Sequence, residues 1–213
     1  MSLKSSKIKV SRIVEILKEK YPDAKCALDF TTPWELLVAT ILSAQCTDKR
    51  VNMITPALFK KYNDIEAFAK ADIKELETDI HSAGFYHNKA KNIIGCAQGL
   101  LNLYNGSIPE TVEELVKLPG VGRKTANCLL GNWFGIAEGI VVDTHVSRLS
   151  QKLGLVSSSD PEKIEQELMK LVDKKYWIEF SHWLILQGRE VCIARKPKCE
   201  ICELKAYCSA YNS

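Results

Sequence analysis

The stretch LPGVGRKTANCLLGNWFGIAEGIVVDTHVSR, from Leu118 to Arg148, decides how the whole sequence is interpreted. It opens with a tight turn in which Gly120 and Gly122 stand one residue apart and leave the backbone amides uncovered by side chains. A helix is predicted to start at Arg123. Bare amides at the positive end of a helix suit a phosphate group.

Two side chains capable of chemistry follow this turn. Lys124 places a primary amine on the first turn of the predicted helix, and Asp143 follows nineteen residues later at a polar helix start. A phosphate cradle, an amine and a carboxylate together predict chemistry on a nucleic-acid backbone. Each feature also has an ordinary interpretation: a simple turn, a solvated Arg123-Lys124 pair, and an Asp143 that only caps a helix.

The composition excludes several classes of protein. The 213 residues suffice for one large or two small domains, and a hydrophobic content of 46% is ordinary for a globular protein. A net charge of +3 gives no global basic field, so any nucleic-acid binding must come from local groups. Charged residues interrupt every apolar run, and no signal-peptide pattern follows the N-terminus. We therefore expect a cytoplasmic, nucleoid-associated protein with no membrane partner.

The periodicity predicts an all-α fold, because no stretch alternates as a strand for more than a few residues. A central buried helix is expected over 34–45, followed by a polar turn at Ser43–Asp48. Pro56 could break the next helix, and Gly188 is expected to end the last one. The first helix has no partner nearby in the sequence, so we expect it to pack against C-terminal helices. The other predicted helices cover 8–20, 48–61, a segment from 72, 89–104, a segment from 109, 123–134, 141–153, 161–173 and 175–188.

Half of the eight cysteines crowd into the C-terminal end of the chain. The spacing Cys-x6-Cys-x2-Cys-x5-Cys suits either zinc or an iron–sulfur cluster. The wide outer gaps favour the cluster, because four-cysteine zinc sites usually pair two short knuckles. The four residues are Cys192, Cys199, Cys202 and Cys208.

A basic loop lies between the first two of these cysteines. It carries Arg195, Lys196 and Lys198 around Pro197. If a metal site holds the loop, three cations are presented together to phosphates. Without the metal site it would be a solvated basic loop.

Four segments resemble the endonuclease III family of DNA glycosylases, within the helix-hairpin-helix superfamily. They occur in the family's order across nearly the whole length. The resemblance implies a bifunctional enzyme of base excision repair, which removes oxidised pyrimidines from damaged double-stranded DNA and then nicks the abasic site. The segments are LPGVGRKTAN (118–127), VDTHVSR (142–148), LSAQCTD (42–48) and CIARKPKCEICELKAYC (192–208).

The resemblance also implies the architecture and the cofactor. Two helical lobes would flank a DNA-binding cleft, and a 4Fe-4S cluster would sit on the four C-terminal cysteines. One lobe would be a six-helix barrel with the helix-hairpin-helix motif, at about residues 24–137. The other would be a discontinuous cluster lobe of residues 1–23 and 138–213. We expect the protein to act as a monomer.

The family's functional residues carry over to matching positions. Lys124 would attack C1′ of the sugar and form an imine, and Asp143 would stabilise positive charge on that sugar. The phosphate grip would fall to a hairpin of five residues: Leu118, Gly120, Val121, Gly122 and Arg123.

Other positions are expected to contact the DNA or the flipped base. Gln45 would fill the space left by the flipped nucleotide, although it could equally be a capping amide. Phe85 occupies the position of an apolar wedge, more often Leu, and could instead be a core aromatic. His145 could orient the site, contact phosphate or be purely structural. The expected pocket residues are Ser43, Asp48 and His87.

Three other functions compete with this interpretation. The adenine glycosylase branch usually lacks the amine at Lys124 and carries a further C-terminal domain. A non-catalytic iron–sulfur DNA-binding module would not need Lys124 and Asp143. A helical DNA-binding protein with zinc would be colourless, whereas an iron–sulfur cluster is brown.

Overall fold

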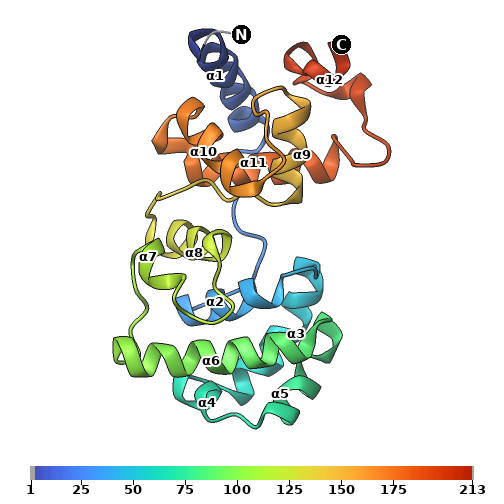
Figure 1. Cartoon of the computed structure of the whole chain (residues 1–213). Helices are drawn as coiled ribbons and strands as arrows, with labels where there is room; N and C mark the ends of the chain where they lie inside the picture. The colour runs from blue at the N-terminus through green and yellow to red at the C-terminus, as the bar shows by residue number, and fades with distance from the viewer. Residues whose placement is uncertain (1–2, 213) are drawn as a thin grey trace. The chain divides into compact units, whose positions relative to one another are not determined.

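The structure, a computed structural model, describes residues 3–212, with side chains from residue 5 onward (Figure 1). Within these residues every regular element is a helix, so the predicted all-α class is confirmed. The chain divides into two compact units. One unit is Cys26–Glu138, and the other joins the residues up to Lys25 with those from Gly139 onward. Each unit has its own hydrophobic core.

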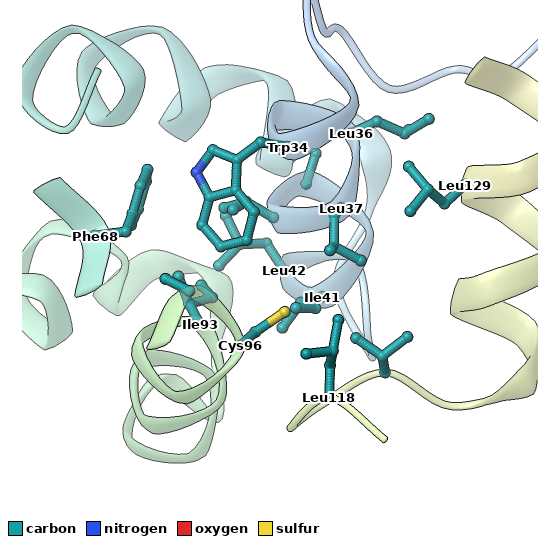
Figure 2. Close-up of a cluster of buried hydrophobic side chains, with 14 of the residues drawn as sticks. Trp34, Leu36, Leu37, Ile41, Leu42, Phe68, Ile93, Cys96, Leu118 and Leu129 are labelled. Atoms are coloured by element: carbon teal, nitrogen blue, oxygen red, sulfur yellow. The ribbon is translucent and has the colours of Figure 1, made fainter. Parts of the chain in front are cut away.

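The unit Cys26–Glu138 is built around α2, whose residues from Leu36 to Leu42 are all buried. Helices α3, α6 and α8 pack against it. Figure 2 shows part of this core, with Ile93 and Cys96 from α6 and Leu129 from α8. The elements of this unit are α2 (Pro33–Leu42), α3 (Asp48–Lys61), α4 (Ile65–Ala69), α5 (Ile73–Asp79), the short 3-10 turn η1 (His81–Ala83), α6 (Tyr86–Tyr104), α7 (Val112–Leu115), α8 (Arg123–Leu129) and the π-helical turn η2 (Leu130–Phe134).

The boundaries of α2 and α3 follow from local chemistry. The Thr32 hydroxyl accepts a hydrogen bond from the Glu35 amide at 3.1 Å and caps α2. Helix α2 ends at Leu42, three residues earlier than predicted, because the chain turns through a left-handed Gln45. The predicted break at Pro56 is wrong, since α3 runs through it without interruption.

The other unit packs α1 (Leu3–Lys20) against α10 (Pro161–Leu171) and α11 (Trp177–Glu190), while α9 (Thr144–Lys152) lies against α11 (Figure 1). Val10, Ile13 and Leu17 of α1 belong to the same core as these C-terminal helices. The remaining elements are η3 (Lys174–Tyr176), η4 (Cys199–Ile201), η5 (Lys205–Tyr207) and α12 (Ser209–Asn212). No helix within residues 3–212 is long and apolar enough to cross a membrane.

Gly188 does not end α11, contrary to the prediction, because the helix continues to Glu190. The glycine instead allows α9 to approach closely. A Cβ at this position would lie 2.7 Å from Nδ1 of His145 and 3.0 Å from Nη2 of Arg148. The sequence signal for a helix stop therefore marks a close helix contact here.

The predicted turn joins α7 to α8 and packs against α6. Gly120 has φ +76°, and a Cβ there would lie 2.7 Å from the Cβ of Asn92 on α6. Gly99 of α6 makes room for the turn, because a Cβ there would be 2.8 Å from the Leu118 side chain. Gly122 is different: its φ is −90° and nothing lies within 4 Å of an added Cβ.

Substitutions of Gly120 and Gly122 test whether the two glycines have different roles. Gly120→Ala should lower the free energy of unfolding by about 2 kcal/mol or more, because it adds left-handed strain to a steric clash. Gly122→Ala should change that free energy by less than about 1 kcal/mol, since only a helix N-cap preference is affected. Urea denaturation of both variants measures the difference. Equal losses would contradict this assignment of the strain.

Candidate active site and cysteine-lined cavity

Lys124 lies exposed on the first turn of α8, directly after the hairpin. Leu118 and Val121 are buried and fix the turn in the core, whereas Gly120 and Gly122 are exposed. Gly122 is the N-cap of α8, and no side chain caps the helix there. The two glycines therefore form the open surface of the predicted phosphate grip, and Leu118 and Val121 act as its anchors.

The Cys128 thiol lies one helical turn after Lys124. A hydrogen bond with Cys26 lowers the pKa of Cys128, burial opposes this shift, and Thr40 and the charge of Lys124 lower the pKa further. The Asn132 amide lies 3.6 Å from the same sulfur atom. The charge of Lys124 therefore acts on the Cys128 thiol, which lies on the same helix.

Asp143 is the N-cap of α9. Its Oδ1 accepts hydrogen bonds from the His145 and Val146 amides, both at 2.8 Å. The ordinary interpretation of Asp143 as a cap is thus confirmed. Oδ2 takes part in neither bond, so capping is compatible with a second role. Lys124 belongs to the unit Cys26–Glu138, and Asp143 belongs to the other unit.

His145 packs inside its own unit, against Gly188 and Arg148. Burial lowers its pKa, which the charge of Asp143 opposes. Arg148 places Nη2 at 3.3 Å from the Nδ1 of His145 and donates to the carbonyl oxygens of Gly188 and Cys192 at 3.1 and 2.9 Å. His145 therefore has a structural role, and its contact with phosphate stays a prediction.

The predicted wedge and gap-filling residues stand on two strained turns. Gln45 has φ +53° and Phe85 has φ +50°, a left-handed conformation that costs about 1–2 kcal/mol in a non-glycine residue. Both side chains are exposed, with 61% of Phe85 accessible. The alternative of Phe85 as a core aromatic is wrong. Ala83, two residues earlier, is buried.

The three expected pocket residues occupy different positions. Ser43 is half-buried after α2, and its hydroxyl donates to the Thr40 carbonyl at 2.8 Å. Asp48 is the half-buried first residue of α3. His87 lies on the surface, where its Nδ1 is 2.8 Å from a carboxylate oxygen of Glu77. Their contact with a flipped base stays a prediction.

Sequence reasoning missed Lys89, which is only 4% exposed. Its Nζ donates to the carbonyl oxygens of Leu42 at 2.8 Å and Ala83 at 3.0 Å. The signal was present, because Lys89 falls on the apolar stripe that continues through Ile93 and Cys96. A lysine at a core position of an amphipathic helix is unusual.

The four C-terminal cysteines line one cavity of about 130 Å³. Cys192, Cys202 and Cys208 also border a smaller space of about 30 Å³ lined with leucines. Within residues 5–212, no three His, Cys, Asp or Glu side chains gather closely enough to hold a single metal ion. A cavity lined by four thiols, an all-thiolate donor set, fits an iron–sulfur cluster.

Gln187 forms hydrogen bonds both to a cysteine of this cavity and to Tyr21, the residue that follows α1. It is 1% exposed on α11 and donates Nε2 to the sulfur of Cys202 at 3.5 Å. Its Oε1 accepts from the hydroxyl of Tyr21 at 2.9 Å, and its carbonyl accepts from the Cys192 amide at 2.7 Å. This residue was also missed, although it lies at the core spacing of Phe180 and Leu184.

The basic loop is closed by a hydrogen bond from the Lys198 amide to the Val191 carbonyl at 2.9 Å. Arg195, Lys196 and Lys198 are exposed on it. The bond fixes the two ends of the loop, so the three cations are presented together to solvent.

Comparison with known proteins defines the class. Residues 38–174 match the HhH-GPD superfamily of base excision DNA repair proteins. Residues 192–208 match the iron–sulfur binding domain of endonuclease III. The chain is therefore a helix-hairpin-helix DNA repair protein with an iron–sulfur segment, and the second match favours the cluster over zinc.

Individual relatives narrow the assignment. An endonuclease III from Synechocystis sp. is 53% identical over 96% of this chain and 93% of its own length. A solved non-covalent endonuclease III–DNA complex is 41% identical with a TM-score of 0.93, covering 97% of this chain and 96% of that one. A trapped covalent endonuclease III–DNA intermediate has the same identity and TM-score, covering 97% of both chains. The chain belongs to the endonuclease III family, whose members are DNA glycosylases with abasic-site lyase activity and carry a 4Fe-4S cluster.

Gln187 offers a test of how the protein tunes this cofactor. Gln187→Leu keeps the side-chain volume but removes the donor to Cys202. The reduction potential of the cluster should fall by roughly tens of millivolts, because hydrogen bonds to ligand sulfurs stabilise the more negative reduced state. Potentiometric titration measures the shift. Tyr21→Phe leaves the sulfur contact in place and should shift the potential less; equal shifts in the two variants would contradict the argument.

Proposed function

We propose that this chain removes oxidised pyrimidines from damaged double-stranded DNA in base excision repair and then cleaves the strand at the abasic site. The main observation behind this proposal is the exposed amine of Lys124 in a chain of the endonuclease III family. Lys124 directly follows the glycine hairpin, at the start of a helix that no side chain caps. The trapped covalent intermediate of a similar protein supports a covalent route.

Lys124 is the nucleophile of the first step. Its neutral amine attacks C1′ as the bond from C1′ to the base breaks, and the base leaves with the bonding electrons. The nitrogen loses one proton, and the ring oxygen O4′ then leaves C1′ with its electron pair and takes up a proton, which gives a protonated imine. Because Lys124 is exposed in the protein, the bound DNA is what covers this amine during the reaction.

The imine makes the second step possible. It acidifies the C2′ proton, and removal of that proton expels the 3′ phosphate oxygen with its electron pair. Asp143 stabilises the positive charge that develops on the sugar and helps to transfer protons. Its Oδ1 holds the start of α9, so the backbone fixes where the carboxylate stands.

The protein binds DNA without reading its base sequence, because most of the proposed contacts are made with the sugar–phosphate backbone of the DNA. The amides of Gly120 and Gly122 bind phosphates, and the loop of Arg195, Lys196 and Lys198 adds cations. Gln45 fills the space that the flipped nucleotide leaves, and Phe85 wedges into the base stack. His145 and Arg123 contact phosphate. The entrance for the base is bordered by Ser43, Asp48 and His87.

Cys192, Cys199, Cys202 and Cys208 would hold the cluster, and these ligands would then fix the basic loop between the first two of them. One chain carries both the amine and the carboxylate, which supports action as a monomer. The division into two compact units supports our assignment of a barrel domain to about residues 24–137 and of a cluster domain to residues 1–23 and 138–213. The protein acts where its DNA is, in the cytoplasm at the nucleoid, a reducing compartment that preserves thiolate ligands.

Replacing the amine tests the nucleophile. Lys124→Ala should abolish the borohydride-trapped adduct with DNA and slow strand cleavage on the order of 1,000-fold or more, because no other group forms the imine. A duplex with thymine glycol and one with a plain abasic site are the substrates. Lys60→Ala, at an exposed lysine on α3, serves as the control and should trap DNA normally. A Lys124→Ala protein that still cleaves and traps DNA would disprove the assignment.

Asp143→Asn separates the two roles of that carboxylate. Asn is as good an N-cap as Asp, so the free energy of unfolding should change by less than about 0.5 kcal/mol. Base excision should slow about 100-fold, because the negative charge near the sugar is lost. Asp143→Ala should in addition lose about 1 kcal/mol of stability with the cap. Urea denaturation and single-turnover excision measure the two effects. Normal excision by Asp143→Asn would show that Asp143 acts only as a cap.

A further inference from the structure

The turns at Gln45 and Phe85 in the unit Cys26–Glu138 are strained, so other contacts must stabilise them. Gln45 and Phe85 adopt left-handed backbone conformations that favour glycine. Asn105, the other non-glycine residue with positive φ in residues 3–212, is a helix C-cap, where asparagine is well tolerated. Gln45 and Phe85 lack that justification, so their surroundings must impose the conformation.

One buried amine reaches both turns. Nζ of Lys89 donates to the carbonyl oxygen of Leu42, three residues before Gln45, at 2.8 Å. It also donates to the carbonyl oxygen of Ala83, two residues before Phe85, at 3.0 Å. The two acceptors belong to segments far apart in sequence, so one nitrogen atom joins them.

Lys89 also holds the Phe85 turn from its other side. The Lys89 backbone amide donates to the Phe85 carbonyl at 3.1 Å, in the first turn of α6. Its side chain meanwhile bonds to the residue two positions before Phe85. The turn is therefore closed from both ends by the same residue.

The acceptors are suited to a cation. Leu42 is the last residue of α2 and Ala83 is the last residue of η1, and both carry carbonyl oxygens that a helix leaves without a partner. Helix C-termini carry partial negative charge. Burial lowers the pKa of Lys89, and Cys46, next to Gln45, opposes this shift. A buried lysine is an expensive way to stabilise a core, which favours a role in placing the turns.

We propose that Lys89 is a positioning residue that sets the spacing between the Gln45 turn and the Phe85 turn, so that both side chains enter the DNA helix together when the damaged nucleotide leaves it. The proposal rests on the proposed function, because it assumes that Gln45 fills the vacated space and that Phe85 wedges into the base stack. Lys89 itself touches no DNA and acts through the two turns.

A double-mutant cycle tests this dependence. The variants are Lys89→Met, the double variant Gln45→Ala/Phe85→Ala, and the triple variant that combines them. Lys89→Met alone should slow single-turnover excision from a thymine glycol duplex about 10- to 100-fold, the scale of a small misplacement. In the triple variant, Lys89→Met should add less than about threefold, since the groups it positions are gone.

Two controls separate positioning from general damage. Cys96→Ala truncates another fully buried side chain of α6, two helical turns beyond Lys89, and should lower the stability. Its effect on excision should be small, and thermal melting establishes that both variants are folded. Borohydride trapping on a single-stranded abasic oligonucleotide should be unchanged by Lys89→Met, since there is no duplex for Gln45 and Phe85 to enter.

The possible outcomes are distinct. An additive loss in the triple variant, normal excision by Lys89→Met, or an equal loss in Cys96→Ala would overturn the positioning role. If the unaltered protein neither excises thymine glycol nor traps DNA, the proposed function itself fails. Strand cleavage by the unaltered protein together with additive losses would leave the function standing and reject only the inference about Lys89.

Discussion

The close packing of the hairpin against helix α6 is the constraint on which the Cys26–Glu138 unit depends. Gly95 and Gly99 have no side chains, so Pro119 and Leu118 of the hairpin can pack closely against α6. A side chain at position 120 would clash with Asn92 of α6, so this position requires glycine. The next face of the same helix carries Lys89, which holds the two exposed turns. One helix thus fixes the hairpin proposed to bind phosphate and the residues proposed to enter the duplex.

Departures from ordinary folding preferences gather at one end of this helix. Gln45 and Phe85 have left-handed backbones without being glycine, and Lys89 is charged at a core position. Elsewhere in the unit, helices are capped by Thr32, Thr47 and other preferred residues. Residues with an unfavourable backbone conformation or an unfavourable burial are expected at functional sites, where function outweighs their energetic cost.

Local signals in the sequence predicted the helices, the hairpin and the cysteine cluster, because each depends on residues close together in the chain. One long-range contact was predicted, the packing of the first helix against C-terminal helices, but the contacts of individual side chains were not. Gly188 carried a helix-stop signal, yet it is buried against His145, which lies far away in sequence. Lys89 and Gln187 stood on apolar stripes, but only the folded structure shows which carbonyl or sulfur each one reaches.

Buried polar side chains fix the irregular segments of both units, and a physical reason connects the cases. Turns and helix ends leave carbonyl groups without partners, and short irregular segments bury little apolar surface that could hold them. A buried donor solves both problems at once, because it satisfies the carbonyl and ties the segment to a helix. Lys89 does this for two turns, and Arg148 does it for the end of α11 and the carbonyl of Cys192. Gln187 extends the same principle to a cysteine sulfur. A protein that must place loops accurately on DNA therefore gains positional precision from groups that add little to its stability.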